Sequence, residues 1–203
     1  MALERLVRPL VLASASPARL ETLRRAGLEP EVIVSGVDET EVVAPTPGRL
    51  AAVLAELKCR AVAAGRPDRL VLGCDSVLEF DGEALGKPRD PEVARERWQA
   101  MRGNAGVLHT GHCLRRGDDE VVRSVATRVH FAYVTDEEID AYVASGEPLQ
   151  VAGGFTIDGL GGAFISRIEG DHHNVTGLSL PVLREMLHDF GVLWTDLWSI
   201  RRP

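Results

Sequence analysis

Three clusters of polar residues interrupt apolar stretches and carry groups that could do chemistry. The first is residues 14–19, where Ser16 followed by Pro17 predicts a helix start, with serine as the N-cap. The unpaired N–H groups of a helix N-terminus make it a binding place for anions. Arg19 falls in this first turn, where the helix dipole disfavours a cation, so a bound phosphate would stabilise it. The alternative is a solvated arginine beside an ordinary N-cap.

Acidic residues form the second and third clusters. Glu39 lies in residues 36–41, after a predicted strand, and Asp75 closes the apolar strand predicted over residues 70–74. Carboxylates that meet at strand ends could hold Mg²⁺ or Mn²⁺, which prefer oxygen ligands and bridge phosphates. Acids are also common in turns at strand ends, and each cluster taken alone is better explained in that way.

Lysine is rare in this chain, and its two positions are candidates for phosphate binding. Of 23 basic residues only Lys58 and Lys87 are lysines, and a compact ammonium suits phosphate. Lys58 lies at the edge of the apolar stripe of a predicted helix, from which it could reach a binding site. Lys87 lies in a loop. The alternatives are a lysine whose stem covers apolar surface and an ordinary turn lysine.

The histidines give a weaker signal. His109 and His112 are three residues apart in a predicted strand, which places them on opposite faces. His172 and His173 are adjacent and lack further ligands at the spacing of known zinc sites. The sequence therefore does not predict a metal site built on histidine.

Composition limits the classes of function. Net charge is −7, which argues against a surface for nucleic acid but not against one small anion. The three cysteines show no CxxC spacing, and no segment has the length and apolarity of a leader or a membrane span. We expect reduced thiols in a cytoplasmic protein with no nucleic-acid or membrane partner.

The predicted elements place these clusters at strand ends. Apolar patterns predict strands over residues 10–13, 31–35 and 70–80, and alternating patterns predict an antiparallel pair over 107–114 and 121–132. Helices are predicted from residues 17, 47, 91 and 136 and over 180–190. The alternation predicts an α/β fold with a mixed, largely antiparallel sheet and flanking helices.

The sequence closely resembles the Maf family of nucleotide pyrophosphatases in eight stretches, which run in the same order between residues 10 and 190. Five are LASASPAR (12–19), SGVDE (35–39), ELKCRAVA (56–63), LGCDSV (72–77) and LGKPRD (85–90). The other three are GVLHTGHCL (106–114), YVASGEPLQVAGGFTIDGLGGAFI (142–165) and GDHHNVTGLSLPVL (170–183).

The resemblance implies a two-lobed fold similar to the inosine triphosphatase group, with a nucleotide bound between the lobes and a homodimer as the expected assembly. It implies one domain over residues 1–203, with a tail at 191–203. The expected reaction converts a nucleoside triphosphate to a monophosphate and pyrophosphate, with a function in clearing non-canonical or modified nucleotides.

The resemblance also implies roles for individual residues. Asp75 is expected to be the general base and, with Glu39, a ligand of Mg²⁺ or Mn²⁺. Five residues are expected around the phosphates of the substrate: Ser14, Ser16, Arg19, Lys58 and Lys87.

Three residues depart from the family pattern at substrate-binding positions that, by the resemblance, are expected to choose the nucleobase. Ala18 replaces the third residue of SPRR or SPWR, and Ser76 follows Asp75 where the family has threonine or glutamine. Asp158 stands in place of glutamine or glutamate. We therefore expect a base preference other than strict selectivity for dTTP and UTP.

Two other classes of function fit the sequence less well. A dinucleotide-dependent oxidoreductase lacks support because no GxGxxG follows the first strand. A nucleotide-binding regulator of septum formation and cell division, with little catalysis, would need a site that binds without cutting. The presence of Asp75, Glu39 and both lysines favours the enzyme. Trp194 and Trp198 are apolar enough to dock the tail on the body of the protein or on a partner, and docking on the body is the expected case.

Overall fold

The computed structural model, which describes residues 9–199, is built on one seven-stranded sheet in the order β2-β1-β3-β5-β6-β7, with β4 paired to β3. β1 is parallel to β2 and β3, and the other pairs are antiparallel. This confirms the predicted mixed, largely antiparallel sheet. The strands are β1 (Val11–Ala13), β2 (Glu31–Val32), β3 (Val71–Phe80), β4 (Glu83–Leu85), β5 (Ala105–Arg116), β6 (Asp119–Phe131) and β7 (Ile165–Glu169).

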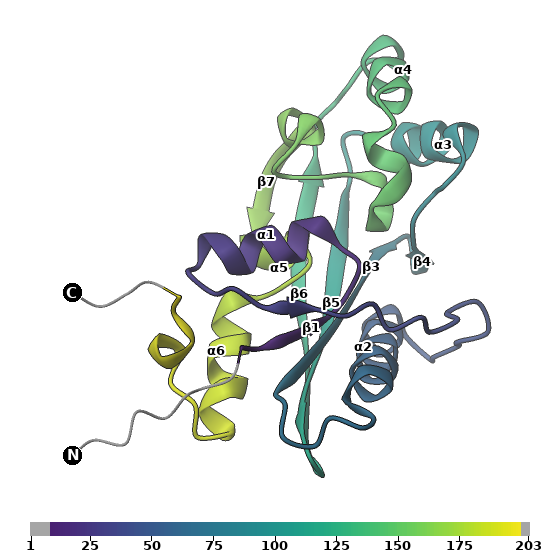
Figure 1. The fold of residues 1–203 in the computed structure, drawn as a ribbon. Helices are drawn as coiled ribbons and strands as arrows, with labels where there is room; N and C mark the ends of the chain where they lie inside the picture. The colour runs from purple at the N-terminus through teal and green to yellow at the C-terminus, as the bar shows by residue number, and fades with distance from the viewer. Residues whose placement is uncertain (1–8, 200–203) are drawn as a thin grey trace.

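Helices cover both halves of the long strands (Figure 1). The α-helices are α1 (Pro17–Arg25), α2 (Pro47–Ala63), α3 (Pro91–Met101), α4 (Asp136–Ala144), α5 (His172–Val175) and α6 (Leu180–Asp189). α1, α2 and α6 lie around one half, which we call the lower lobe, and α3 and α4 lie around the upper lobe. β3, β5 and β6 run through both lobes and connect them.

Each lobe has its own hydrophobic core. In the lower lobe one cluster lies between the sheet and helices α1 and α6, and another lies between the sheet and α2. In the upper lobe Trp98 makes edge-to-face contacts with Phe131 and Tyr142, with ring centroids 5.6 and 5.3 Å apart. The indole N–H of Trp98 donates to Gly154 O at 2.8 Å, so the large ring is buried with its polar atom paired.

The predicted helix starts are confirmed at the residues that signalled them. Ser16 caps α1 and Thr46 caps α2, each followed by proline, and Asp90 caps α3 in the same way. Thr135 forms the predicted capping box at α4. In each case a side-chain oxygen accepts from a backbone N–H that the helix itself leaves unpaired.

Two parts of the secondary structure differ from the sequence-based prediction. The strand predicted over residues 31–35 is only Glu31–Val32, because β2 pairs with a three-residue β1 and both its residues are exposed. β7 and α5 were not predicted. No residue of β7 is fully buried, so its sequence lacks the alternation of apolar and polar residues that predicts a strand. α5 has only four residues, which is too few to show a helical period.

One edge of β3 lacks a neighbouring strand over a short stretch. β1 pairs with β3 as far as Gly73, and β4 begins its pairing at Leu78. Residues 74–77 therefore pair only with β5, on the other side. Asp75 and Ser76 lie in this interval, which we call the open edge of β3, and their side chains point to opposite faces of the sheet.

The tail is docked on the lower lobe as predicted for Trp194, whereas the prediction is wrong for the side chain of Trp198, which is exposed. Trp194 and Leu197 pack against the core beside α1 and α6. Leu28 forms a backbone bridge with Trp198, whose side chain stays 45% exposed. Residues 1–8 and 200–203 of the predicted domain lie outside the described residues. Among residues 9–199 no helix is both long and apolar enough to cross a membrane. The three cysteines are free and buried, as expected for reduced thiols.

Candidate active site

Lys58 binds two carboxylates on the α2 face of the sheet. Its Nζ lies 2.7 Å from Glu39 Oε1 and donates a hydrogen bond to Asp75 Oδ1. Lys58 and Asp75 are buried, whereas the side chain of Glu39, in the loop after β2, is 45% exposed. The structure thus joins three residues that the sequence singled out separately. One ammonium and two carboxylates give this group a net charge of −1.

Two glycines allow α2 to come close enough for this contact. A Cβ on Gly73 of β3 would lie 2.3 Å from Ala55 O, and one on Gly111 of β5 would lie 2.2 Å from Ala51 O. Any side chain at either position would push α2 away from the sheet. Asp75 lies two residues beyond Gly73, so it shares the face that α2 covers. The close packing of α2 is therefore what brings its lysine to the carboxylate.

Arg19 is the buried cation on the opposite, α1 face of the sheet, as Lys58 is on the α2 face. It is 8% exposed, and all three guanidinium nitrogens donate hydrogen bonds. Nε donates to Gly177 O at 2.7 Å, Nη1 to Ser14 Oγ at 3.1 Å and Nη2 to Ser76 Oγ at 3.0 Å. Ser14 also accepts from Ser16 N at 3.1 Å, and Ser16 Oγ accepts from Arg19 N at 3.4 Å. Four predicted residues therefore form one hydrogen-bonded group at the start of α1.

The charge of Arg19 is not neutralised by a carboxylate. Within residues 9–199 no acidic side chain lies within 4 Å of its guanidinium, and its acceptors are hydroxyls and a carbonyl. The charge of Arg19 also acts on nearby His112. Burial, and then the positive charge of Arg19, lower the pKa of the His112 imidazole to about 4. His112 is therefore neutral, and its Nε2 accepts from Ser179 N at 2.9 Å.

A second layer of polar residues holds Ser76 in place. Ser76 Oγ is 2.9 Å from Thr110 Oγ1, which donates to Asn174 O at 3.1 Å. Asn174 is buried and donates through Nδ2 to Leu108 O and Thr127 Oγ1, both at 3.1 Å. This chain of contacts ties α5 to β5 and β6 and fixes the position of the Arg19 group.

Sequence reasoning missed the supporting residues of this layer. Thr110, Asn174 and Gly177 occur inside the matched stretches, but none was assigned a role. A signal did exist for Thr110, because a polar residue at the centre of a buried strand needs a hydrogen-bonding partner. Gly177 acts through its carbonyl, for which the residue type gives no signal.

The remaining predicted residues lie outside these contacts. Lys87 and Asp158 are exposed, and Ala18 is half-buried in the first turn of α1. Lys87 lies in the loop after β4, and Asp158 in the segment between α4 and β7. Their assignment to phosphate and base binding stays a prediction. Ser76, expected to choose the base, contacts the arginine, and its effect on base choice also stays a prediction.

The two loops that carry Lys87 and Asp158 are nevertheless connected. Gly153 N donates to Gly86 O at 3.2 Å, and Arg89 N donates to Leu149 O at 3.1 Å. Glu147 accepts hydrogen bonds from Tyr142, Thr156, Leu160 and Gly161 and so organises the backbone around residue 158. Both candidates therefore belong to one upper-lobe rim, which we define as residues 86–89 and 147–161.

Fold and site together define an α/β protein with paired carboxylates and a buried, uncompensated arginine at one sheet edge. Comparison with known proteins agrees. A family model described as "Maf-like protein" matches residues 9–190. A protein of Streptomyces coelicolor named "Nucleoside triphosphate pyrophosphatase" is 59% identical, with 95% of each chain covered. One of the same name from Microcystis aeruginosa is 50% identical, with 94% of this chain and 98% of the relative covered.

The chain belongs to the Maf family. The expected enzyme class is confirmed by relatives that carry the name of that hydrolase. The structure also resembles that of the Staphylococcus aureus Ham1 protein, with a TM-score of 0.51, 16% identity, and 90% of this chain and 100% of that chain covered. At this identity the likeness shows a shared fold, which confirms the expected fold class.

Proposed function

We propose that this protein hydrolyses nucleoside triphosphates to nucleoside monophosphates and pyrophosphate at the open edge of β3. The observation that carries the proposal is the buried Arg19, whose charge lacks a carboxylate partner among the described residues. Keeping an unpaired charge away from water is unfavourable. A phosphate bound at the α1 N-terminus would supply the missing negative charge.

The α2 face offers the complementary charge. Glu39 and Asp75 already converge on one cation, the ammonium of Lys58, and their oxygens are the hard donors that Mg²⁺ and Mn²⁺ prefer. We infer that these two carboxylates hold the divalent metal that the reaction requires. When bound, such an ion would neutralise charge on the phosphates.

Asp75 is the residue we assign to proton transfer. Its carboxylate lies at the open edge, where residues 74–77 have no strand on one side. It would take a proton from the water that attacks the α-phosphorus, while the bond between the α-phosphorus and the bridging oxygen breaks and pyrophosphate leaves. Lys58 holds this carboxylate in place, and Arg19 would hold the phosphates on the other face.

The upper-lobe rim is proposed to bind the rest of the nucleotide. Lys87 and Asp158 come from loops that are hydrogen-bonded to each other. We place the nucleotide between the lobes, with Lys87 toward the phosphates and Asp158 toward the base. An ionised carboxylate only accepts hydrogen bonds, so it favours a base edge that offers N–H donors.

The test is product analysis in water labelled with ¹⁸O. The protein is incubated with each canonical triphosphate and a panel of modified ones, with Mg²⁺ or Mn²⁺. Monophosphate, diphosphate, pyrophosphate and orthophosphate are then separated and their label is measured. We expect pyrophosphate and a monophosphate that carries the ¹⁸O. Orthophosphate and diphosphate as the only products would reject the proposal, and label in pyrophosphate would move the attack away from the α-phosphorus.

A regulatory function predicts a different outcome. A nucleotide-binding regulator of septum formation would bind a triphosphate, measurable by calorimetry, and release no pyrophosphate with any metal. A preference for modified nucleotides in the same panel would support a role in clearing them. A link to cell division is tested in cells by comparing the wild-type protein with Asp75→Asn, since a role that needs only binding survives that change.

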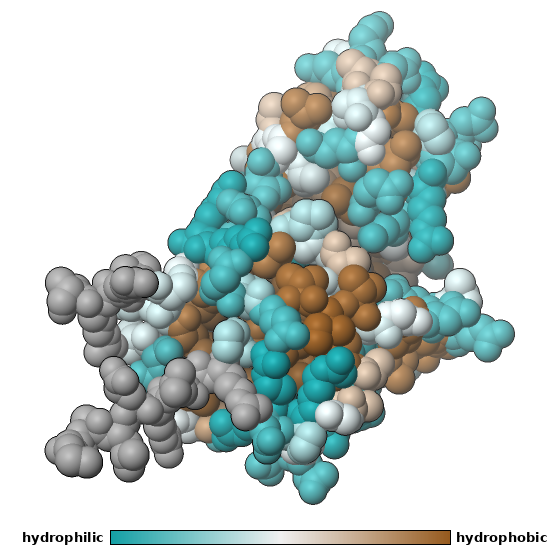
Figure 2. All heavy atoms as spheres, in the orientation of Figure 1, coloured by the Kyte–Doolittle hydropathy of each residue, from teal (hydrophilic) through white to brown (hydrophobic). Residues whose placement is uncertain are grey.

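We also propose a homodimer. β2 is an edge strand, and Val32 and Val34 beside it are 42% and 62% exposed. Figure 2 shows hydrophobic side chains gathering on this face around β2 and the segment that follows it. Light scattering should give twice the chain mass, and Val34→Lys should lower it to that of one chain. A wild-type protein of single-chain mass at micromolar concentration would reject the dimer.

A further inference from the structure

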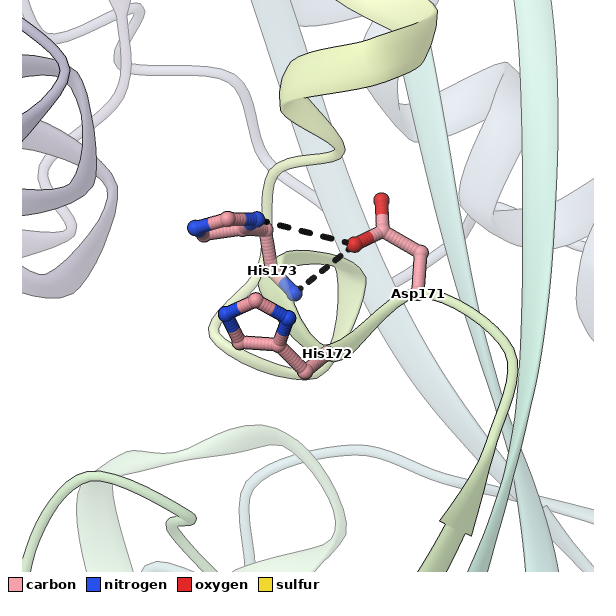
Figure 3. A group of neighbouring side chains, drawn as sticks. All are labelled: Asp171, His172 and His173. Atoms are coloured by element: carbon pink, nitrogen blue, oxygen red, sulfur yellow. Dashed lines mark hydrogen bonds and ion pairs between the residues drawn. The ribbon is translucent and has the colours of Figure 1, made fainter.

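Asp171, His172 and His173 bring three metal-binding side chains together between β7 and α6 (Figure 3). One ligand atom from each lies within 4.8 Å of the other two. The two imidazole rings lie against each other, with centroids 3.8 Å apart. Asp171 Oδ1 faces the second ring, 3.7 Å from His173 Nδ1. The three side chains therefore converge on one small volume.

These side chains have few partners of their own. Among residues 9–199 neither imidazole of the pair makes a hydrogen bond, and Asp171 Oδ2 is buried without one. Nor does any described lysine or arginine lie within 4 Å of the Asp171 carboxylate. By contrast, His130 is 2.8 Å from Glu169 and is thereby satisfied. A cation that accepts both nitrogen and oxygen donors would satisfy the whole cluster.

The backbone that carries the cluster is already fixed. Asp171 O accepts from Thr127 Oγ1 at 3.0 Å, and Asp171 Oδ1 accepts from His173 N at 2.9 Å. Thr176 Oγ1 donates to His173 O at 2.8 Å, and the buried Asn174 anchors the segment to the sheet. Binding an ion would then require ordering of only a few side-chain torsions, which favours affinity.

We propose that Asp171, His172 and His173 bind one divalent transition-metal ion of the Zn²⁺ type, apart from the metal assigned to Glu39 and Asp75. Two imidazole nitrogens and one carboxylate oxygen form a donor set of zinc sites in which water takes the fourth position. Mg²⁺ prefers oxygen donors and is not expected here. The sequence did not predict this site because its third ligand directly precedes the histidine pair, rather than standing at a zinc-finger spacing.

The site would act on the segment that holds Arg19. Residues 171–177 end at Gly177, whose carbonyl accepts from Arg19 Nε at 2.7 Å. An ion bound at the start of this segment would stabilise it in the arrangement that the structure shows. It should therefore raise the melting temperature of the whole protein, by about 5 °C when free Zn²⁺ exceeds its dissociation constant a hundredfold.

The experiment is calorimetric titration of the full chain with Zn²⁺, without nucleotide, followed by Co²⁺ titration read by d–d absorption. We expect one tight Zn²⁺ site with a spectrum typical of mixed nitrogen and oxygen ligands. His172→Ala and Asp171→Asn should each weaken it roughly tenfold or more. Both variants are chosen to keep the fold, because the histidine is exposed and asparagine can still cap α5. His130→Ala, which removes a satisfied histidine, is the matched control and should bind as the wild type does.

Asp75→Asn separates this site from the proposed catalytic metal. If the tight Zn²⁺ site survives in Asp75→Asn and is lost in His172→Ala, the proposal holds, whether or not the protein hydrolyses nucleotides. If the site is lost in Asp75→Asn and kept in His172→Ala, the ion lies at Glu39 and Asp75 and the proposal is wrong. Unchanged affinity in both His172→Ala and Asp171→Asn, or no tight site in the wild type, would also overturn it.

Discussion

The two faces of β3 carry groups of opposite net charge, although the residues that point to them are neighbours in the strand. Asp75 points toward α2, where two carboxylates share one lysine and leave a net charge of −1. Ser76 points toward α1, where hydroxyls and a carbonyl surround one arginine and leave its positive charge uncompensated. One face therefore favours a cation and the other an anion. A metal–triphosphate complex at the open edge of β3 would satisfy both.

The largest expected effect is on catalysis at the acidic face. Asp75→Asn should lower kcat by about 10²–10⁴-fold, because an amide cannot take a proton from water. Initial rates of pyrophosphate release measure this, with melting curves to verify folding. Glu79→Gln is the matched control, since Glu79 lies on the same strand and face but contacts His109 at 2.7 Å. Near-normal activity of Asp75→Asn would remove Asp75 from the mechanism.

In the protein without ligand, the loss of Lys58 should lower the free energy of unfolding more than the loss of Arg19 does. Lys58→Met leaves two carboxylates without their cation and should lower the free energy of unfolding by on the order of 3 kcal/mol. Arg19→Met removes a charge that has no carboxylate partner, and Ser14 and Ser76 keep other hydrogen bonds. Its effect should be smaller, about 1 kcal/mol, because the Gly177 carbonyl is the acceptor that loses its donor. Urea unfolding of both variants at pH 7 makes the comparison, and equal losses would contradict it.

The stability of the protein should depend on pH through His112, whose pKa is lowered by burial and by the charge of Arg19. Its folded pKa of about 4 lies below the unfolded value, because burial and then Arg19 disfavour the imidazolium. The unfolded chain therefore binds the proton first. Stability is full above pH 6.5 and falls toward pH 4, by up to about 1.4 kcal/mol per pH unit. The difference between wild type and His112→Asn isolates this effect from the carboxylates, and Arg19→Met should reduce it. Identical pH profiles for wild type and His112→Asn would contradict the assignment.

A smaller effect should show whether Ser76 positions Arg19 or chooses the nucleobase. Ser76→Ala removes one of three acceptors of the guanidinium, so kcat/KM should fall about fivefold with every nucleobase alike. Ser76→Thr keeps the hydroxyl and should restore most of the activity. A loss confined to one base would return Ser76 to the role in base choice that the family resemblance implied.

The smallest expected effect concerns the upper-lobe rim. Asp158→Gln supplies a donor as well as an acceptor and should shift preference toward thymine and uracil nucleotides about threefold. The ratio of kcat/KM across all triphosphates measures this, and Lys87→Ala should instead lower activity with every base. A wild-type enzyme already restricted to dTTP and UTP would remove the basis of this prediction.

The sequence by itself determined most of the elements and their ends. N-cap residues followed by proline fixed the starts of α1, α2 and α3, because these local contacts need no tertiary partner. The alternating patterns predicted the antiparallel pair that β5 and β6 form, whereas only the tertiary structure showed that β3 pairs with β5. The short, exposed elements were missed because β7 and α5 carry no apolar period.

Tertiary structure alone decided which polar residues meet. Lys58, Glu39 and Asp75 are joined only because Gly73 and Gly111 let α2 lie close to the sheet. The sequence equally could not show that Arg19 is buried without a carboxylate, or that Asp171 turns toward the two histidines after it. Local patterns encode backbone conformation residue by residue. Charge compensation depends on distances between segments far apart in the chain, which packing sets.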